Sequence, residues 1–132
     1  MQNNFLKKII AQSQEDLQVI SACCSEAKIK ISDIKYLSNN KIFLMSLSRL
    51  NKEKENYKKL INSIVKFEFI ESTKSKNINQ NNPNLILELI AINLFKKDKN
   101  FEIILLFSKN RIITLTSEVI EATLEDQKKI DD

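Results

Sequence analysis

Two different hydrophobic periods divide the chain. Apolar residues recur at spacings of three and four from Leu17 to Ala27, which predicts an amphipathic helix over residues 14–26. Ser13 stands just before it and can cap the first free amides, and Asp16 occupies the reciprocal position of a capping box. This helix is therefore expected to pack by one face against the rest of the molecule.

After this helix the period changes to two, which is typical of strands with one wet face. Together with a short strand before the helix, the predicted strands cover residues 5–10, 28–31, 34–37, 42–50, 60–70, 85–95, 101–107 and 111–115. Short polar turns separate most of them, so we expect antiparallel hairpins. Within 60–70, the side chains of Val65, Phe67 and Phe69 are expected to face inward.

Three segments leave more room for interpretation. Residues 71–84 are rich in Ser, Lys and Asn and predict a mobile loop, and 51–56 predict an exposed charged connection. The segment 85–95 is apolar on both faces, and a helix beginning at Asn82–Pro83 is an alternative to the strand. Residues 118–127 predict a second helix, after which 128–132 should fray.

These elements predict a single domain over residues 1–132 of the α+β class. Because several strands need cover on both faces, we expect the antiparallel sheet to curl into a partly closed barrel with two flanking helices. A pleckstrin-homology-like barrel with a C-terminal helix is the nearest shape by analogy.

Residue types missing from the composition exclude several kinds of chemistry. The chain has no glycine, so it has no P-loop and no glycine-rich dinucleotide turn. It has no histidine, which removes the usual catalytic triads and common zinc sites. We therefore expect no enzyme activity, no cofactor and no metal. The adjacent Cys23 and Cys24 are expected to be two small buried apolar side chains.

Charge and hydropathy narrow the choice of partners. The net charge is +4, with the positive charge concentrated in residues 1–66. A Lys-rich half of this kind could attract nucleic acid or an acidic ligand. Yet 19 of the 21 basic residues are Lys, and phosphate readout favours Arg. No signal peptide or membrane span is recognisable, so we expect a cytoplasmic protein.

One residue stands out as a candidate ligand-binding group. Arg49 continues the face shared by Phe43, Met45 and Leu47 at the end of the strand over 42–50. An inward-pointing Arg at a barrel mouth can bind an anion or a carboxylate. The alternative is a stem that covers the edge of the core while the head reaches water.

The strands 85–95 and 101–107 predict an exposed apolar face that a homodimer would bury. The interface candidates on this face are Ile86, Ile90, Ile92, Leu94, Ile104 and Leu106. The alternative is that the helices and the 71–84 loop cover them. We thus expect a non-catalytic protein-interaction or structural module, with nucleic-acid or acidic-ligand binding as the alternative.

The order of several motifs resembles a known family. They are Glu15–Ser21, Ile34–Leu37, Phe43–Arg49, Leu85–Ile92 and Val119–Asp126. These resemble an uncharacterised, largely alphaproteobacterial family, domain-of-unknown-function family 2948, over residues 6–126. The chain departs from it by lacking Trp and Gly, and by carrying residues 51–59 in place of an Arg-rich segment. The resemblance implies a small cytoplasmic bacterial protein and carries over no site residue.

Overall fold

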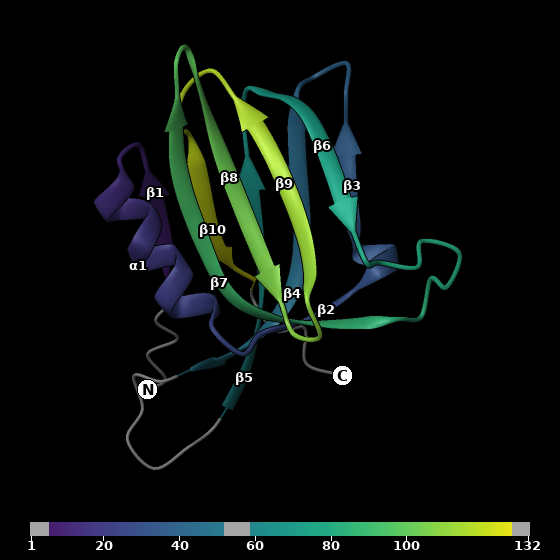
Figure 1. The fold of residues 1–132 in the computed structure, drawn as a ribbon. Coiled ribbons are helices and arrows are strands. Elements are labelled where there is room, and N and C mark those ends of the chain that lie inside the picture. Colours follow the sequence, from purple (N-terminus) through teal and green to yellow (C-terminus); the bar gives the residue numbers. More distant parts are fainter. Residues whose placement is uncertain (1–5, 52–58, 128–132) are drawn as a thin grey trace.

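In the part of the chain that the structure describes, ten strands form one antiparallel sheet and a single α-helix packs beside it (Figure 1). The computed structural model describes residues 6–51 and 59–127. The helix is α1 (Gln14–Cys24), and a 3-10 turn, η1, covers Ile31–Asp33. The strands are β1 (Lys8–Ala11), β2 (Lys28–Lys30), β3 (Ile34–Leu37), β4 (Ile42–Asn51), β5 (Lys59–Phe67), β6 (Ile70–Lys76), β7 (Ile86–Lys97), β8 (Asn100–Phe107), β9 (Arg111–Ser117) and β10 (Ala122–Asp126).

The sheet runs in the order β1-β10-β5-β4-β2-β7-β8-β9-β6, and β3 pairs with the first half of β4. The three-residue strand β2 links its two halves, because it pairs with β4 on one side and β7 on the other. The sheet folds over at this point, so that β7, β8 and β9 lie in front of β4, β5 and β10 in Figure 1. The core fills the space between these two layers.

Helix α1 lies at one side of the layers, against β7, β1 and β4. Leu17, Ile20 and Cys24 on its inner face are buried, as the helical spacing predicted. Ser21 ties it to the sheet, because its hydroxyl accepts a hydrogen bond from the backbone N–H of Ile92 at 2.8 Å. The helix therefore covers the layers from the side.

The predicted cap of α1 is confirmed, with one difference. The Ser13 hydroxyl accepts the N–H of Asp16 at 3.1 Å, which supplies one of the free donors at the helix start. The Asp16 carboxylate accepts the N–H of Gln12 at 3.4 Å, one residue before the expected partner. The predicted burial of the cysteines is confirmed for Cys24, whereas Cys23 is only half-buried.

Most predicted strands are present, and the segment 85–95 is a strand, so the helix alternative for it is wrong. Leu87 and Leu89 of β7 are fully buried in the core. Phe43, Met45 and Leu47 of β4 point inward as predicted, as do Val65 and Phe67 of β5.

The predicted second helix is wrong, because residues 122–126 form β10 between β1 and β5. Ile120 and Leu124 lie four apart, which suits a helix face, but Ala122, Leu124 and Asp126 also alternate as a strand requires. Pairing on both sides decides in favour of the strand. The analogy with a pleckstrin-homology-like barrel thus loses the C-terminal helix on which it relied, and the sheet stays open with β1 and β6 at its edges.

The loop predicted over 71–84 is wrong in its first part, because residues up to Lys76 belong to β6. An edge strand exposes most of its side chains, which explains the polar composition of this segment. Phe69 was expected to face inward but is 46% exposed. Its φ of 62° reverses the alternation between β5 and β6, so that Ile70 is buried instead.

Without glycine, ordinary residues take the left-handed backbone positions of the turns. Lys41 has φ 58°, at the turn between β3 and β4. Lys109 and Asn110, with φ 64° and 59°, form the predicted tight turn between β8 and β9. The predicted connection over 51–56 and the fraying end lie outside the described residues, except for Asn51, the last residue of β4.

Candidate functional site

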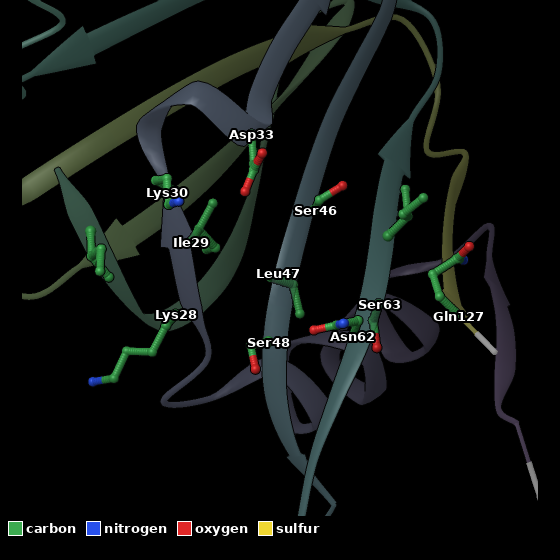
Figure 2. A pocket seen from close by; sticks show the side chains of 12 residues that line it. Lys28, Ile29, Lys30, Asp33, Ser46, Leu47, Ser48, Asn62, Ser63 and Gln127 are labelled. Atoms are coloured by element: carbon green, nitrogen blue, oxygen red, sulfur yellow. The ribbon is translucent and has the colours of Figure 1, made fainter. Parts of the chain in front are cut away.

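A hollow of about 770 Å³ lies on the outer side of β2, β4 and β5 (Figure 2). It forms because β4 changes neighbour along its length. Lys28 of β2 pairs with Ser48, whereas Ile34 of β3 pairs with Met45, and η1 crosses between the two strands. Polar groups that line the hollow are Lys28, Lys30, Asp33, Ser46, Ser48 and Asn62.

These groups can donate several hydrogen bonds, but their charges nearly cancel. Lys28 Nζ lies 3.0 Å from Glu88 Oε1, so this lysine already has an anionic partner. Asp33 shares the hollow with Lys30. A ligand here would meet hydroxyl and amide groups and little net positive charge, which favours a polar ligand over a multiply charged one.

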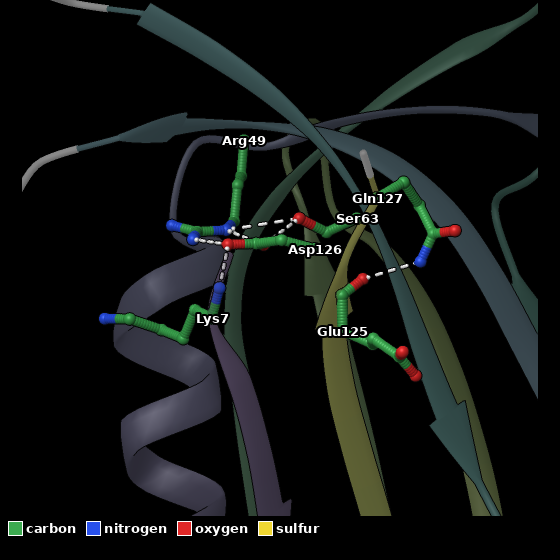
Figure 3. A network of polar contacts seen from close by, with 6 residues as sticks. All are labelled: Lys7, Arg49, Ser63, Glu125, Asp126 and Gln127. Atoms are coloured by element: carbon green, nitrogen blue, oxygen red, sulfur yellow. Dashed lines mark hydrogen bonds and ion pairs between the residues drawn. The ribbon is translucent and has the colours of Figure 1, made fainter. Parts of the chain in front are cut away.

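A second group of polar side chains is buried where β1, β4, β5 and β10 meet (Figure 3). The Arg49 guanidinium donates to the Asp126 carboxylate through Nη2 at 2.8 Å and through Nε at 3.1 Å. The Ser63 hydroxyl donates to the same carboxylate at 2.6 Å, and the N–H of Lys7 does so at 2.9 Å. The side chains of Arg49 and Asp126 are only 2% and 1% exposed.

The network keeps both charges at ordinary pH. Burial alone would raise the pKa of the Asp126 carboxyl, but hydrogen bonds from Arg49, Ser63 and Lys7 and the Arg49 charge outweigh it, so this pKa is lowered. Burial alone would lower the pKa of Arg49, but the hydrogen bond and charge of Asp126 outweigh it, so this pKa is raised. The two groups therefore form a buried ion pair.

Arg49 was singled out as a candidate anion ligand on an inward-pointing face, and it does point inward. The carboxylate against it is Asp126 of the same chain. Among the described residues, no buried side-chain nitrogen or oxygen lacks a hydrogen-bond partner, so the network offers no spare buried donor. Binding of an outside anion by Arg49 stays a prediction.

Sequence reasoning missed Asp126 because it assigned the C-terminal segment to a helix. It also missed Ser63, although this residue shares the inward alternation of Val65 and Phe67 in the strand predicted over 60–70. The alternation of Ala122, Leu124 and Asp126 with Thr123 and Glu125 was the signal that could have placed this carboxylate on an inner face.

The six interface candidates do not share one face. A β-bulge between Leu89 and Ala91 reverses the alternation of β7. Ile92 is therefore in the core, at 3% exposure, and Leu94 packs partly against the core. Ile86 borders the hollow of Figure 2. Only Ile90, Ile104 and Leu106 remain together on the outside of β7 and β8.

The described residues hold no group of three His, Cys, Asp or Glu side chains that could bind a metal ion. They also contain no helix that is long and apolar enough to cross a membrane.

The fold and these sites define an α+β protein built mainly from one open antiparallel sheet with a single helix. The chain belongs to the family described as Protein of unknown function (DUF2948), whose model matches residues 7–131. No protein of curated function matches it. Among solved structures, it is similar to the crystal structure of an uncharacterized protein from Neisseria gonorrhoeae, with 16% sequence identity and a TM-score of 0.48. That similarity covers 90% of this chain and 97% of the other.

Proposed function

We propose that this protein is a non-catalytic interaction module of the bacterial cytoplasm, one domain in its whole length, that pairs with a second copy of itself. One observation carries the proposal, which is an apolar surface on the outside of β7, β8 and β9. We name it the outer apolar face and define it by Ile90, Ile104, Leu106 and Ile112.

The strand register places these side chains side by side. Ala91 of β7, Leu106 of β8 and Ile112 of β9 are direct neighbours across the sheet. Ile90 at the bulge is 52% exposed. A hollow of about 530 Å³ runs past Ile90, Leu106 and Ile112. An apolar surface of this kind on a sheet that already pairs its strands is typical of a protein interface.

Nothing in the described part of the chain lies over this surface. Helix α1 contacts β7 from the side of the buried Ile92, and its other main contacts are with β1 and β4. Figure 1 shows the helix beside the layers and not in front of β8 and β9. The alternative in which a helix covers the candidates therefore has no support.

The charges at the two ends of the face are compatible with a second copy. Glu102 lies at one end, where its Oε1 is 3.3 Å from Lys97 Nζ, and Lys76 and Arg111 border the hollow at the other. A two-fold axis near Ile104 would set each Glu102, together with its Lys97 partner, opposite the basic end of the other copy. Hydrophobic contact is therefore the main way in which this surface complements itself, and charge adds little.

Light scattering after size exclusion tests this proposal. We expect a mass of twice 15.3 kDa at micromolar concentration. Ile90→Asp should return the mass to one chain without loss of folding, because a buried unpaired charge opposes the interface. Ile86→Asp is the matched control, since Ile86 is 55% exposed on the same strand but borders the other hollow. A single-chain mass at every concentration would overturn the proposal.

Binding of nucleic acid or another acidic ligand is the second candidate. Lys30 and the hydroxyls of Ser46 and Ser48 support it (Figure 2), whereas Asp33 and the ion pair of Lys28 with Glu88 oppose it. Phosphate binding releases counterions, so affinity for single- or double-stranded DNA should fall steeply as salt rises. A gel-shift titration at several salt concentrations tests it with Lys30→Gln, against Lys99→Gln in the β7–β8 turn as control. Equal binding by both variants would count against this hollow.

A further inference from the structure

No β-ladder joins β3 to β6, although the two strands face each other at one side of the sheet. We call their facing edges the seam. Within residues 6–51 and 59–127, β3 pairs only with β4, and β6 pairs only with β9. The seam is held together at one end. There the N–H of Ile70 donates to the carbonyl oxygen of Lys41 at 2.8 Å, and the Tyr36 hydroxyl donates to the carbonyl oxygen of Ile70 at 2.8 Å.

Beyond this point the two edges enclose a cleft of about 450 Å³. Ile34 and Tyr36 form the β3 wall, Thr73 and Ser75 form the β6 wall, and Ile113 and Ile78 add apolar surface. The Gln80 side-chain amide donates to the Ser75 hydroxyl at 2.6 Å and so tethers the loop after β6 to this strand. The cleft thus combines apolar side chains on the β3 side with hydroxyl, amide and amine groups on the β6 side.

The backbone of the seam offers hydrogen bonds as well. An edge strand leaves one row of N–H and C=O groups without a ladder partner. Along residues 72–76 of β6 and 34–37 of β3, the described chain forms no backbone pairing across the seam. Two such rows border the same cleft. This arrangement can receive an extended peptide by strand addition, in which main-chain bonds give affinity and alternate side chains give specificity.

The outer rim of the seam carries positive charge. Lys35 on β3 and Lys74 and Lys76 on β6 are exposed, and the described residues provide none of them with an ion-pair partner. Lys41 at the closed end differs, because its Nζ lies 2.7 Å from Glu71 Oε2. A chain lying in the seam would therefore meet lysines on both sides of its outward-facing positions.

We infer that the seam binds an extended peptide in which apolar and acidic residues alternate. The apolar side chains enter the cleft over Ile113 and Ile78, and the acidic ones face Lys35 and Lys74. Residues 72–76 span about 16 Å at the rise of a strand, which sets a bound length of about five residues. This inference rests on the proposed role as an interaction module, but it uses a surface separate from the outer apolar face.

Selection from a displayed library of nine-residue peptides on the full-length protein tests the inference. We expect enriched sequences to alternate apolar and acidic residues, and the winning peptide to shift backbone amide NMR signals of residues 72–76 and 34–37. Lys35→Glu combined with Lys74→Glu should weaken its binding by about tenfold or more, because two attractive charge contacts become repulsive. Lys99→Glu, in the β7–β8 turn, is the matched charge control and should leave binding unchanged.

Two N-methylated versions of the winning peptide test insertion between both edges. One is methylated at the odd residues and the other at the even residues, so each loses the N–H groups of one edge only. Both should bind about tenfold more weakly if each edge makes main-chain bonds. A library without enrichment, NMR shifts confined to the outer apolar face, or an N-methylated version that binds as well as the parent would overturn the inference.

The same experiments separate this inference from the proposed self-association. Ile90→Asp should become a single chain in solution and keep its affinity for the peptide. If that variant binds the peptide while the wild-type protein is also a single chain, the self-association fails and the seam stands. If the wild-type protein is a dimer and no peptide is enriched, the seam fails and the self-association stands.

Discussion

Replacing Asp126 by Asn removes one charge from the buried network and keeps a side chain of nearly the same shape. The guanidinium of Arg49 then stays buried, at 2% exposure, without an anionic partner. Solvent screening cannot offset this loss, because neither side chain reaches water. Breaking a buried pair by removing one partner costs roughly 3–5 kcal/mol.

The hydrogen bonds of the network place the expected cost within this range. Nitrogen donors from Arg49 and Lys7 and the Ser63 hydroxyl all converge on the two carboxylate oxygens of Asp126. An amide accepts through one oxygen only, and its NH₂ group faces the donors. At least one buried donor therefore loses its acceptor, at about 1–3 kcal/mol. Since domains of this size are stable by about 5–15 kcal/mol, the variant should still fold but with a much smaller margin.

Urea unfolding at pH 7, followed by far-UV circular dichroism, measures this difference. Asp98→Asn in the β7–β8 turn is the control and should change stability by less than about 0.5 kcal/mol. The double variant Arg49→Met with Asp126→Leu removes both charges and should recover part of the loss, because apolar replacement of a whole buried pair is often neutral. The recovery is partial, since the Ser63 hydroxyl and the N–H of Lys7 still lose their acceptor. A cost below about 1 kcal/mol for Asp126→Asn, or a double variant as unstable as the single one, would refute the reasoning.

Three further outcomes follow from the structure. The pKa of Asp126 is lowered by folding, so the stability that this group contributes is complete above its unfolded pKa of about 3.9 and is lost as pH falls through its folded pKa. Urea unfolding between pH 2 and 7 should therefore show a steeper loss of stability in acid for the wild type than for Asp126→Asn, and parallel curves would contradict this. Ile92→Ala should lower the free energy of unfolding in urea by about 2–5 kcal/mol, whereas Ile90→Ala, at the exposed bulge, should lower that of a single chain by less than about 0.5 kcal/mol. Similar losses for the two variants would contradict the burial assigned to Ile92. Ser13→Ala should cost about 1 kcal/mol by removing the cap of α1, and Ser13→Asp should restore it; an unchanged urea midpoint for Ser13→Ala would contradict the capping role.

Elements with one buried face could be predicted from the sequence. Residues 14–24 keep a helical period because α1 buries only one stripe, and β4 alternates because Phe43, Met45 and Leu47 face the core. In both cases burial acts directly on the local pattern, so the pattern identifies the element.

Local pattern failed where the decisive contact was distant or irregular. Ile120 and Leu124 fit a helix as well as a strand, and only pairing with β1 and β5 selects β10. The bulge after Leu89 shifts the alternation of β7 by one residue, which moves Ile92 from the predicted outer face into the core. Strand β6 has so much exposed surface that its composition is that of a loop.

The candidate site, too, could be predicted only in part from the sequence. Arg49 could be found because its inward position follows from the alternation of its own strand. Its partner could not, because Asp126 lies 77 residues away and meets it only after β5 and β10 have paired. The hollow of Figure 2 and the seam have no local signal either, since both arise where a strand lacks a neighbour along part of its length.

The buried pair also explains how a strand as short as β10 keeps its register. Its inward-facing residues are Ala122, Leu124 and Asp126, and only one of them is a large apolar side chain. A slip of one residue that moves Gln127 into the place of Asp126 would turn Thr123 and Glu125 into the core positions of Ala122 and Leu124 and leave Arg49 facing a neutral amide. The main chain is held at the same point, because the N–H of Asp126 donates to the carbonyl oxygen of Lys7 at 2.9 Å. Hydrophobic burial alone would favour the observed register by little more than the free energy of burying one leucine side chain. The unpaired guanidinium destabilises the slipped register by roughly 3–5 kcal/mol more.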